Sequence, residues 1–432
     1  MLVTYSIKDI SPQANESQAP GPSYIYPHVL FIAKAIKENN GNTKTLFNDV
    51  SDLYGWYNSL VKKVEIDPSV YGPKVKELIA GVSSEEEKIK SIYYWVQDNI
   101  RYVAFEDGIA GFQPDSPQNV FKKRYGDCKG MAFLTKSMLE EAGLDARLVW
   151  IGTDRLAYDY STPSLSVDNH MICAVAVDGD LIFLDGTEKY NRFGEYATRI
   201  QSKQALVQDK EGYKILQVSN KLGSINEDRS TYKLHIEGSA LSGSVERLYS
   251  GECRVSFQNI YASFGKGDQE DVLKRYLTSG NNNYKVHAIQ EFNSEDRDQD
   301  VSIPYMASLE NTVSEFDGTL YIDIDPIKEV KKMMFGERKS DFQFGILQKK
   351  ITEIVLEIPE GYTIETLPEN MDVETDLISL KAKYKNEGGI IIYTKEILYK
   401  EKRISKEDFV SWDATLENFN DHLDQQIVLK KI

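Results

Sequence analysis

The first clear periodicity in the chain is helical. The stretch VYGPKVKELIAGV has apolar residues every three to four positions, and SSEEEKIKSIYYWVQDNI continues this pattern, with Ser84 and Glu87 spaced as a capping box. A third apolar face follows in DCKGMAFLTKSMLEEAG, where Asp127 is the expected N-cap and Gly143 the expected stop. These patterns predict three helices, each with one buried face.

Alternating apolar positions follow these helices. ARLVWIG reads as a strand, residues 155–167 read as a loop, and HMICAVAVDGDLIFLDGT reads as a β-hairpin that turns at Asp178-Gly179. We therefore expect residues 71–210 to form an α+β domain with the helices first and an antiparallel sheet after them.

The rest of the chain is expected to be organised differently. Residues 211–432 contain long alternating stretches such as ITEIVLEIPEGYTI and a helical pattern near the end, SKEDFVSWDATLENFNDHLDQ. They predict a β-rich, mostly antiparallel C-terminal region of one or two domains. Residues 1–70, which include the loop-like SPQANESQAPGPS, are expected to form a separate N-terminal segment, such as the remnant of a β-domain.

Composition excludes several classes of protein. Among 432 residues, 67 acidic against 51 basic side chains give a net charge of −16, which disfavours nucleic-acid binding. No apolar run reaches the roughly 18 residues that a membrane span needs. No signal peptide is visible in MLVTYSIKDISPQ, so the protein is expected to be cytoplasmic, or extracytoplasmic (periplasmic or surface) if an export signal has been removed.

The three cysteines provide the candidate chemistry. Cys128, Cys173 and Cys253 lie far apart without CxxC spacing, which argues against a disulfide framework and against a metal site. Cys128 stands at the predicted helix start behind Gly126, where free N–H groups and the positive end of the helix dipole favour a thiolate. The alternative is that Cys128 is a buried small apolar residue, as many free cysteines are.

A histidine partner has few candidates, because the chain contains only five. His170 begins the predicted hairpin, and a two-residue turn would place Ile172 opposite Asp185. His170 and Asp185 would then be diagonal neighbours on one face, about 7–8 Å apart between Cα atoms and within side-chain reach. A three-residue turn would instead pair Cys173 with Asp185 and move the carboxylate to the other face.

These motifs resemble a known family. GDCKG at Cys128, NH at His170 and FLDGT at Asp185, with IRY, QPDSP and RYGDCKG, are similar to the transglutaminase-like superfamily of papain-type fold. The resemblance is strongest to bacterial chains with the domain order DUF3857, transglutaminase-like, DUF3858. EIPEGYTIETLPEN, ISKEDF and IVLKK carry the weaker C-terminal match. From the roughly 65 residues before the core, the N-terminal domain of that order is expected to be mostly missing.

The resemblance implies a catalytic triad. Cys128 would be the nucleophile, His170 the general base and acid, and Asp185 the group that orients the ring. The backbone N–H of Cys128 and one upstream donor would stabilise an oxyanion, and Gln113 and Tyr102 are the candidates for that donor.

Four further residues have simpler expectations. Asp127 is expected to be a helix cap, Asn169 to shape the start of its strand, Trp150 to belong to the core, and Lys129 to lie in solvent.

The implied function is a thiol enzyme that acts on amide bonds through an acyl-thioester. Its substrate would be a peptide or protein, and water or an amine would resolve the thioester, giving a cysteine protease (amidase) or a transglutaminase-type acyltransferase. No cofactor or calcium requirement is implied, because no EF-hand-like loop is present. The alternative is a non-catalytic binding or scaffold module that uses the same fold.

Overall fold

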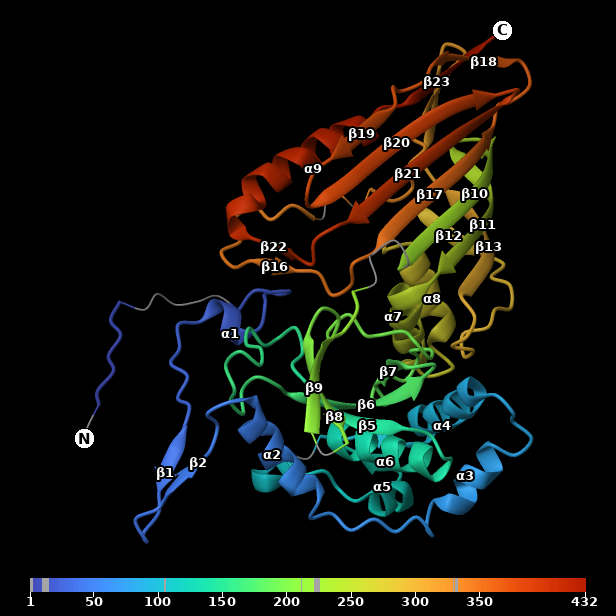
Figure 1. The fold of residues 1–432 in the computed structure, drawn as a ribbon. Helices are drawn as coiled ribbons and strands as arrows, with labels where there is room; N and C mark the ends of the chain where they lie inside the picture. The colour runs from blue at the N-terminus through green and yellow to red at the C-terminus, as the bar shows by residue number, and fades with distance from the viewer. Residues whose placement is uncertain are drawn as a thin grey trace.

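The computed structural model describes residues 3–9, 15–104, 106–210, 212–220, 226–328, 330 and 333–432. Two bodies of structure follow one another along the chain (Figure 1). We call the elements from α2 to β9 the thiol domain, and residues 226–432 the C-terminal region. Before them, the short helix α1 (Pro22–Ile25) is hydrogen-bonded to residues 155–157 of the thiol domain. A two-stranded ribbon of β1 (Ala35–Lys37) and β2 (Thr43–Thr45) extends away from that domain.

Helices cover one face of the thiol-domain sheet. They are α2 (Val50–Val61), α3 (Gly72–Leu78), α4 (Glu85–Asn99), α5 (Pro117–Lys123) and α6 (Cys128–Glu141). The capping signals explain where two of them begin, because Ser84 accepts from Glu87 N at the start of α4 and Asp127 accepts from Gly130 N at the start of α6. A further pair of short strands, β3 (Arg101–Tyr102) and β4 (Tyr125–Gly126), runs parallel beside the start of α6.

The sheet of the thiol domain has the order β7-β6-β5-β8-β9 and is antiparallel throughout. Its strands are β5 (Ala146–Ile151), β6 (His170–Val177), β7 (Asp180–Leu184), β8 (Gln204–Asp209) and β9 (Gly212–Gln217). Residues on one face of β6, such as Cys173, pack against the helices, and those on the other face, such as Ile172, join a smaller cluster. The sheet is therefore buried on both faces at β6.

The C-terminal region is built on an eight-stranded sheet of order β12-β13-β11-β10-β17-β21-β20-β19. These strands are β10 (Glu227–Glu237), β11 (Ala240–Tyr249), β12 (Tyr284–His287), β13 (Val301–Leu309), β17 (Lys349–Glu357), β19 (Met371–Glu374), β20 (Ile378–Glu387) and β21 (Ile390–Tyr399). All neighbouring pairs are antiparallel except β10 with β17.

Smaller elements complete the C-terminal region. A four-stranded sheet contains β14 (Val313–Phe316), β15 (Thr319–Ile322), β23 (Ile427–Lys431) and β18 (Tyr362–Thr366), and β16 (Phe342–Gln343) pairs with β22 (Arg403–Ile404). Helices α7 (Gly251–Ala262), α8 (Gln269–Leu277) and α9 (Phe409–Leu423) pack into the same core as the large sheet, a single cluster that runs from Tyr232 to Leu429. The predicted fold class, α+β followed by a mostly antiparallel β region, is confirmed.

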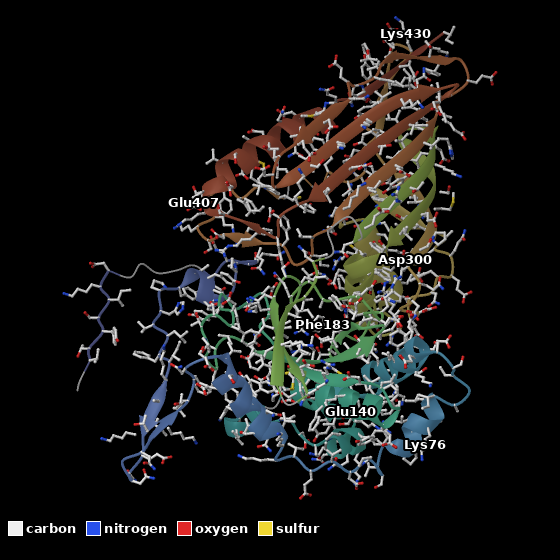
Figure 2. The ribbon with its side chains drawn as sticks, viewed as in Figure 1. Lys76, Glu140, Phe183, Asp300, Glu407 and Lys430 are labelled. Atoms are coloured by element: carbon white, nitrogen blue, oxygen red, sulfur yellow. The ribbon has the colours of Figure 1, made fainter. Side chains whose placement is uncertain are left out.

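Polar contacts join the two bodies. Asp300, labelled in Figure 2, accepts from Arg192 Nη2 at 2.5 Å, and Tyr94 donates to Asp298 Oδ1 at 2.7 Å. The fully buried Arg254 of α7 donates to Glu195 Oε2 at 2.6 Å. The C-terminal region is thus hydrogen-bonded to α4 and to the segment of the thiol domain that follows Asp185.

Candidate active site

Cys128 is the first residue of α6 and lies beside a glycine. Asp127 Oδ1 accepts from Gly130 N at 2.8 Å, which confirms the predicted cap. A Cβ atom on Gly126 would lie 3.1 Å from Val120 Cγ1, so glycine lets β4 approach α5 closely. Cys128 is buried, with only 3% of the residue exposed.

The β6–β7 hairpin has the register predicted from its turn. Asp178 and Gly179 have φ angles of 51° and 90°, as a two-residue type I′ turn requires, and Val177 pairs with Asp180. In this register His170 begins β6 and Asp185 follows the last residue of β7. His170 Nε2 lies 2.8 Å from Asp185 Oδ2, and both side chains are buried.

The imidazole ring links the carboxylate to the thiol. Burial favours the neutral ring, but the charge and hydrogen bond of Asp185 and a hydrogen bond with Cys128 raise the pKa of His170 to about 9. Burial would raise the pKa of Asp185, yet His170 and Arg199 hold this pKa well below its usual range. The structure therefore brings Cys128, His170 and Asp185 together, with the ring between the sulfur and the carboxylate.

Arg199 is a site residue that the sequence analysis missed. Its Nη2 donates to Asp185 Oδ2 at 2.9 Å and to Thr187 Oγ1 at 2.8 Å, and lies 3.2 Å from His170 Nε2. Its Nε donates to Glu188 Oε1 at 2.8 Å. Arg199 belongs to an irregular segment with neither helical nor alternating spacing, so no sequence pattern indicates that it faces the hairpin.

Two parts of the chain match known protein families. Residues 73–180 match the transglutaminase-like superfamily, and residues 319–429 match DUF3858, a domain family of unknown function. The thiol domain is a transglutaminase-like domain. No curated protein matches the chain.

Two solved structures are similar to the chain. A "putative protease" from Parabacteroides distasonis has 10% identity and a TM-score of 0.54, covering 94% of this chain. The match covers 64% of that protein's own length, and at this identity it bears on the fold alone. A "putative cysteine protease" from Cytophaga hutchinsonii has 14% identity and a TM-score of 0.22, covering 35% of this chain and 60% of that one.

A small cavity opens onto the thiol of the transglutaminase-like domain. It has a volume of about 120 Å³ and is lined by Tyr57, Glu106, Gly111, Phe112, Cys128, Lys129, Trp150, Asp168, Asn169, His170 and Met171. Asp168 accepts from Tyr57 Oη at 2.7 Å and from Tyr160 Oη at 3.1 Å. Burial raises the pKa of Asp168 to about 6, against the effect of these two hydrogen bonds. Tyr57 comes from α2, a helix that the sequence analysis did not predict.

The two candidate oxyanion donors lie in different places. Tyr102 in β3 pairs with Gly126, two residues before Cys128. Partial burial raises the pKa of Tyr102, and the negative charge of a Cys128 thiolate raises it further. Gln113 lines a separate cavity of about 480 Å³ with Gly126 and Asp127. Tyr102 is therefore the candidate with the clearer electrostatic link to the sulfur.

The remaining expectations have mixed outcomes. Lys129 was expected in solvent, and this is wrong, because it is buried with its Nζ 2.5 Å from Asp127 Oδ2. Trp150 belongs to the core as predicted and also lines the small cavity. Asn169 shapes the start of β6, since its side chain accepts from Thr153 N and donates to Thr153 Oγ1.

The other two cysteines have a different environment. Both are buried, and burial raises the pKa of Cys173 to about 12 and the pKa of Cys253 well above its usual range. Among the described residues, the acidic, histidine and cysteine side chains form no group able to hold a metal ion. Within the same residues, no helix is both long and apolar enough to cross a bilayer.

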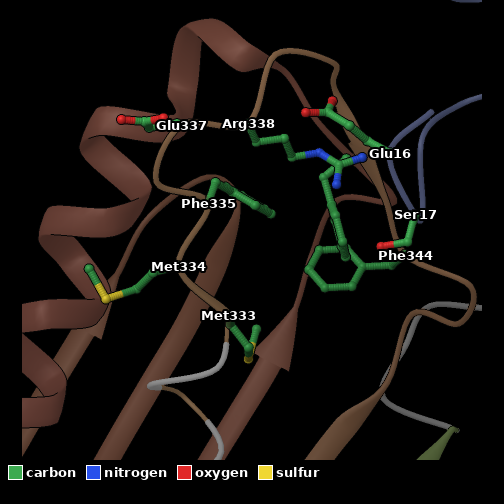
Figure 3. A pocket seen from close by; sticks show the side chains of 9 residues that line it. Glu16, Ser17, Met333, Met334, Phe335, Glu337, Arg338 and Phe344 are labelled. Atoms are coloured by element: carbon green, nitrogen blue, oxygen red, sulfur yellow. The ribbon is translucent and has the colours of Figure 1, made fainter. Parts of the chain in front are cut away.

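A larger cavity lies away from the thiol. Figure 3 shows Phe335, Phe344, Met333 and Arg338 of the C-terminal region around it, together with Glu16 from the N-terminal segment. Its volume is about 560 Å³. The Glu16 carboxylate accepts from the backbone N–H groups of two residues after Arg338, so this cavity marks where the N-terminal segment is attached to the C-terminal region.

Proposed function

We propose that this protein is a thiol enzyme that acts on amide bonds of a peptide or protein through an acyl-thioester. The observation that carries the proposal is the 2.8 Å contact of His170 Nε2 with Asp185 Oδ2, in a ring that also hydrogen-bonds Cys128. The raised pKa of His170 favours an imidazolium at neutral pH, and an imidazolium stabilises a neighbouring thiolate.

The reaction proceeds in two proposed steps. The Cys128 thiolate attacks the carbonyl carbon, and the tetrahedral oxyanion collapses to a thioester as His170 gives its proton to the leaving amine. Water then attacks the thioester, His170 takes a proton from it, and the carboxylic acid leaves with the thiolate restored. Asp185 keeps the ring oriented and stabilises its charge throughout.

The oxyanion needs two hydrogen-bond donors. The backbone N–H of Cys128 is the first, because the leading N–H groups of a helix have no partner within that helix. We assign the second to the hydroxyl of Tyr102 in preference to Gln113, since Tyr102 lies on the strand that pairs with Gly126.

We favour hydrolysis over transfer to an amine, although the same three residues serve both reactions. The competing possibility is a binding module without catalysis, which would agree with the burial of Cys128 and with the small volume, about 120 Å³, of the cavity that it lines. A binding module would have no need for an imidazolium beside the sulfur.

Alkylation separates these two possibilities. The whole chain is treated with iodoacetamide from about pH 5 to about pH 9, and the label is located by mass spectrometry. We expect selective labelling of Cys128 already at low pH and its loss in His170→Ala. Cys173 and Cys253 are internal controls, because burial raises the pKa of both thiols. Equal slow labelling of all three, unchanged in His170→Ala, would support the binding module. Peptide-library cleavage and amine-incorporation assays, run side by side, then distinguish water from an amine as acceptor.

A further inference from the structure

Arg199 connects the His170–Asp185 pair to the C-terminal region. Its guanidinium contacts Asp185, Thr187 and Glu188, and it lies within 3.2 Å of His170 Nε2. A positive charge in this position has two opposite effects. It attracts the Asp185 carboxylate, and it repels a proton on the imidazole.

The backbone that carries Arg199 is held from outside the transglutaminase-like domain. Lys402 of the C-terminal region donates from Nζ to Thr198 O at 2.8 Å, and Thr198 Oγ1 donates to Glu252 Oε2 of α7 at 3.2 Å. One residue later, Arg199 O accepts from Asp154 N at 2.7 Å.

Asp154 is itself fixed by the C-terminal region. Its carboxylate lies 2.6 Å from Lys402 Nζ and accepts from Gln343 Nε2 at 2.9 Å. Lys402 therefore holds this segment at two points. It donates directly to the Thr198 carbonyl, and it pairs with Asp154, whose backbone N–H donates to Arg199 O.

We propose that Arg199 is a positioning residue that sets how strongly His170 holds its proton, and that the C-terminal region controls this setting by fixing residues 198 and 199. This inference rests on the proposed function. It gives the C-terminal region a part in catalysis without placing any of its residues at the thiol.

The charged groups around Arg199 determine the sign of the effect. Asp185, Glu188 and His170 contact its side chain, while Glu252 and Lys402 hold the adjacent Thr198. If Arg199 is removed, Asp185 keeps its place, because Asp185 Oδ1 also accepts from Thr187 N at 3.1 Å and from Thr187 Oγ1 at 2.7 Å. The imidazolium then loses a repulsive neighbour and keeps its attractive one, so His170 should retain its proton to higher pH.

The test measures the rate at which iodoacetate alkylates Cys128 in the whole chain as a function of pH. Iodoacetate is an anion, and the imidazolium attracts it to the thiolate. The alkylation rate therefore falls on the alkaline side of the pH profile, where the imidazolium loses its proton. We expect Arg199→Met to move this alkaline limb to higher pH by about one unit. The expected shift is smaller than the full Coulomb interaction at 3.2 Å, because the Arg199 side chain is partly exposed and water screens its charge. Arg199→Lys should restore most of the original profile, because it keeps the charge.

The C-terminal variants test the coupling. Lys402→Met should move the alkaline limb in the same direction by a smaller amount. Asp300→Asn is the matched control, since it also removes one charge of an ion pair across the same interface, but its partner Arg192 does not contact the triad. Its profile should match that of the unchanged protein.

Each outcome decides between the two proposals. If the unchanged protein shows no selective labelling of Cys128, the proposed function fails. If Cys128 is selectively labelled but Arg199→Met and Lys402→Met leave the alkaline limb in place, this inference alone is wrong. A shift in Arg199→Met without any in Lys402→Met would overturn the part assigned to the C-terminal region. Should Arg199→Met fail to fold, Lys402→Met decides alone, because its side chain is partly exposed and lies outside the site.

Discussion

Replacing Asp185 by Asn should change how the stability of the thiol domain depends on pH. Asn has the same shape, and its carbonyl oxygen can still accept from Thr187, but it has no charge to attract an imidazolium. The folded-state pKa of His170 is about 9, against an ordinary value of 6.5. A group whose pKa is raised by folding stabilises the fold below its unfolded pKa, and this stabilisation is lost as the pH rises through the folded pKa.

The difference between these two pKa values corresponds to about 3 kcal/mol. The free energy of unfolding of the unchanged protein should therefore fall by about this amount between about pH 6 and about pH 10, relative to Asp185→Asn. Asp185 itself has a lowered pKa, so its own contribution is constant over this range. Urea unfolding is followed by tryptophan fluorescence, and three of the four tryptophans, Trp56, Trp95 and Trp150, lie in the thiol domain. Parallel pH profiles for the two proteins would refute the electrostatic reading of the His170–Asp185 contact.

Three further predictions concern residues near the thiol and in the large sheet. Tyr102→Phe should lower kcat by about 100-fold with little change in KM, whereas Gln113→Ala should leave kcat nearly unchanged, and the reverse result in steady-state assays would exchange their roles. Lys129→Met should lower the free energy of unfolding by about 3–5 kcal/mol, because it leaves the buried Asp127 carboxylate without its ion-pair partner. Lys136→Met breaks an ion pair with the exposed Glu140 of the same helix and should lower this free energy by about 1 kcal/mol or less in the same chemical unfolding assay. Gly243→Ala would place a Cβ 2.0 Å from Lys233 O and should lower the thermal midpoint sharply or prevent soluble expression. Gly55→Ala has open space around it in α2 and should stabilise the protein by about 0.5–1 kcal/mol. Equal thermal midpoints for the two variants would contradict the clash at Gly243.

The parts of the site that could be predicted from sequence are those fixed by local chemistry. A two-residue Asp-Gly turn determines the hairpin register, and that register decides which face carries Asp185. The cap at Asp127 likewise determines where α6 begins, and so places Cys128 at its first turn. In both cases the decisive interaction spans only a few residues.

The residues that were missed depend on contacts between distant segments. Arg199 lies in an irregular stretch whose path is set by hydrogen bonds to Asp154 and to the C-terminal region, and no sequence period reports such contacts. Lys129 was misplaced because lysine is usually exposed, and only a buried carboxylate at hydrogen-bond distance reverses that preference. Helix α2 could have been found, because its buried residues Leu53, Tyr54, Tyr57 and Leu60 have helical spacing.

The parallel pair of β10 and β17 has a practical consequence for dissecting the chain. Residues 319–429 match a family of their own, yet the large sheet joins β17 within that stretch to β10, which ends at Glu237. A fragment cut at the start of the matched stretch would lose four strands of the large sheet, β10 to β13, and also β14 of the four-stranded sheet. It would expose a long edge of β17 with unpaired N–H and C=O groups, a template for aggregation. Fragments intended to fold alone should therefore begin before residue 227.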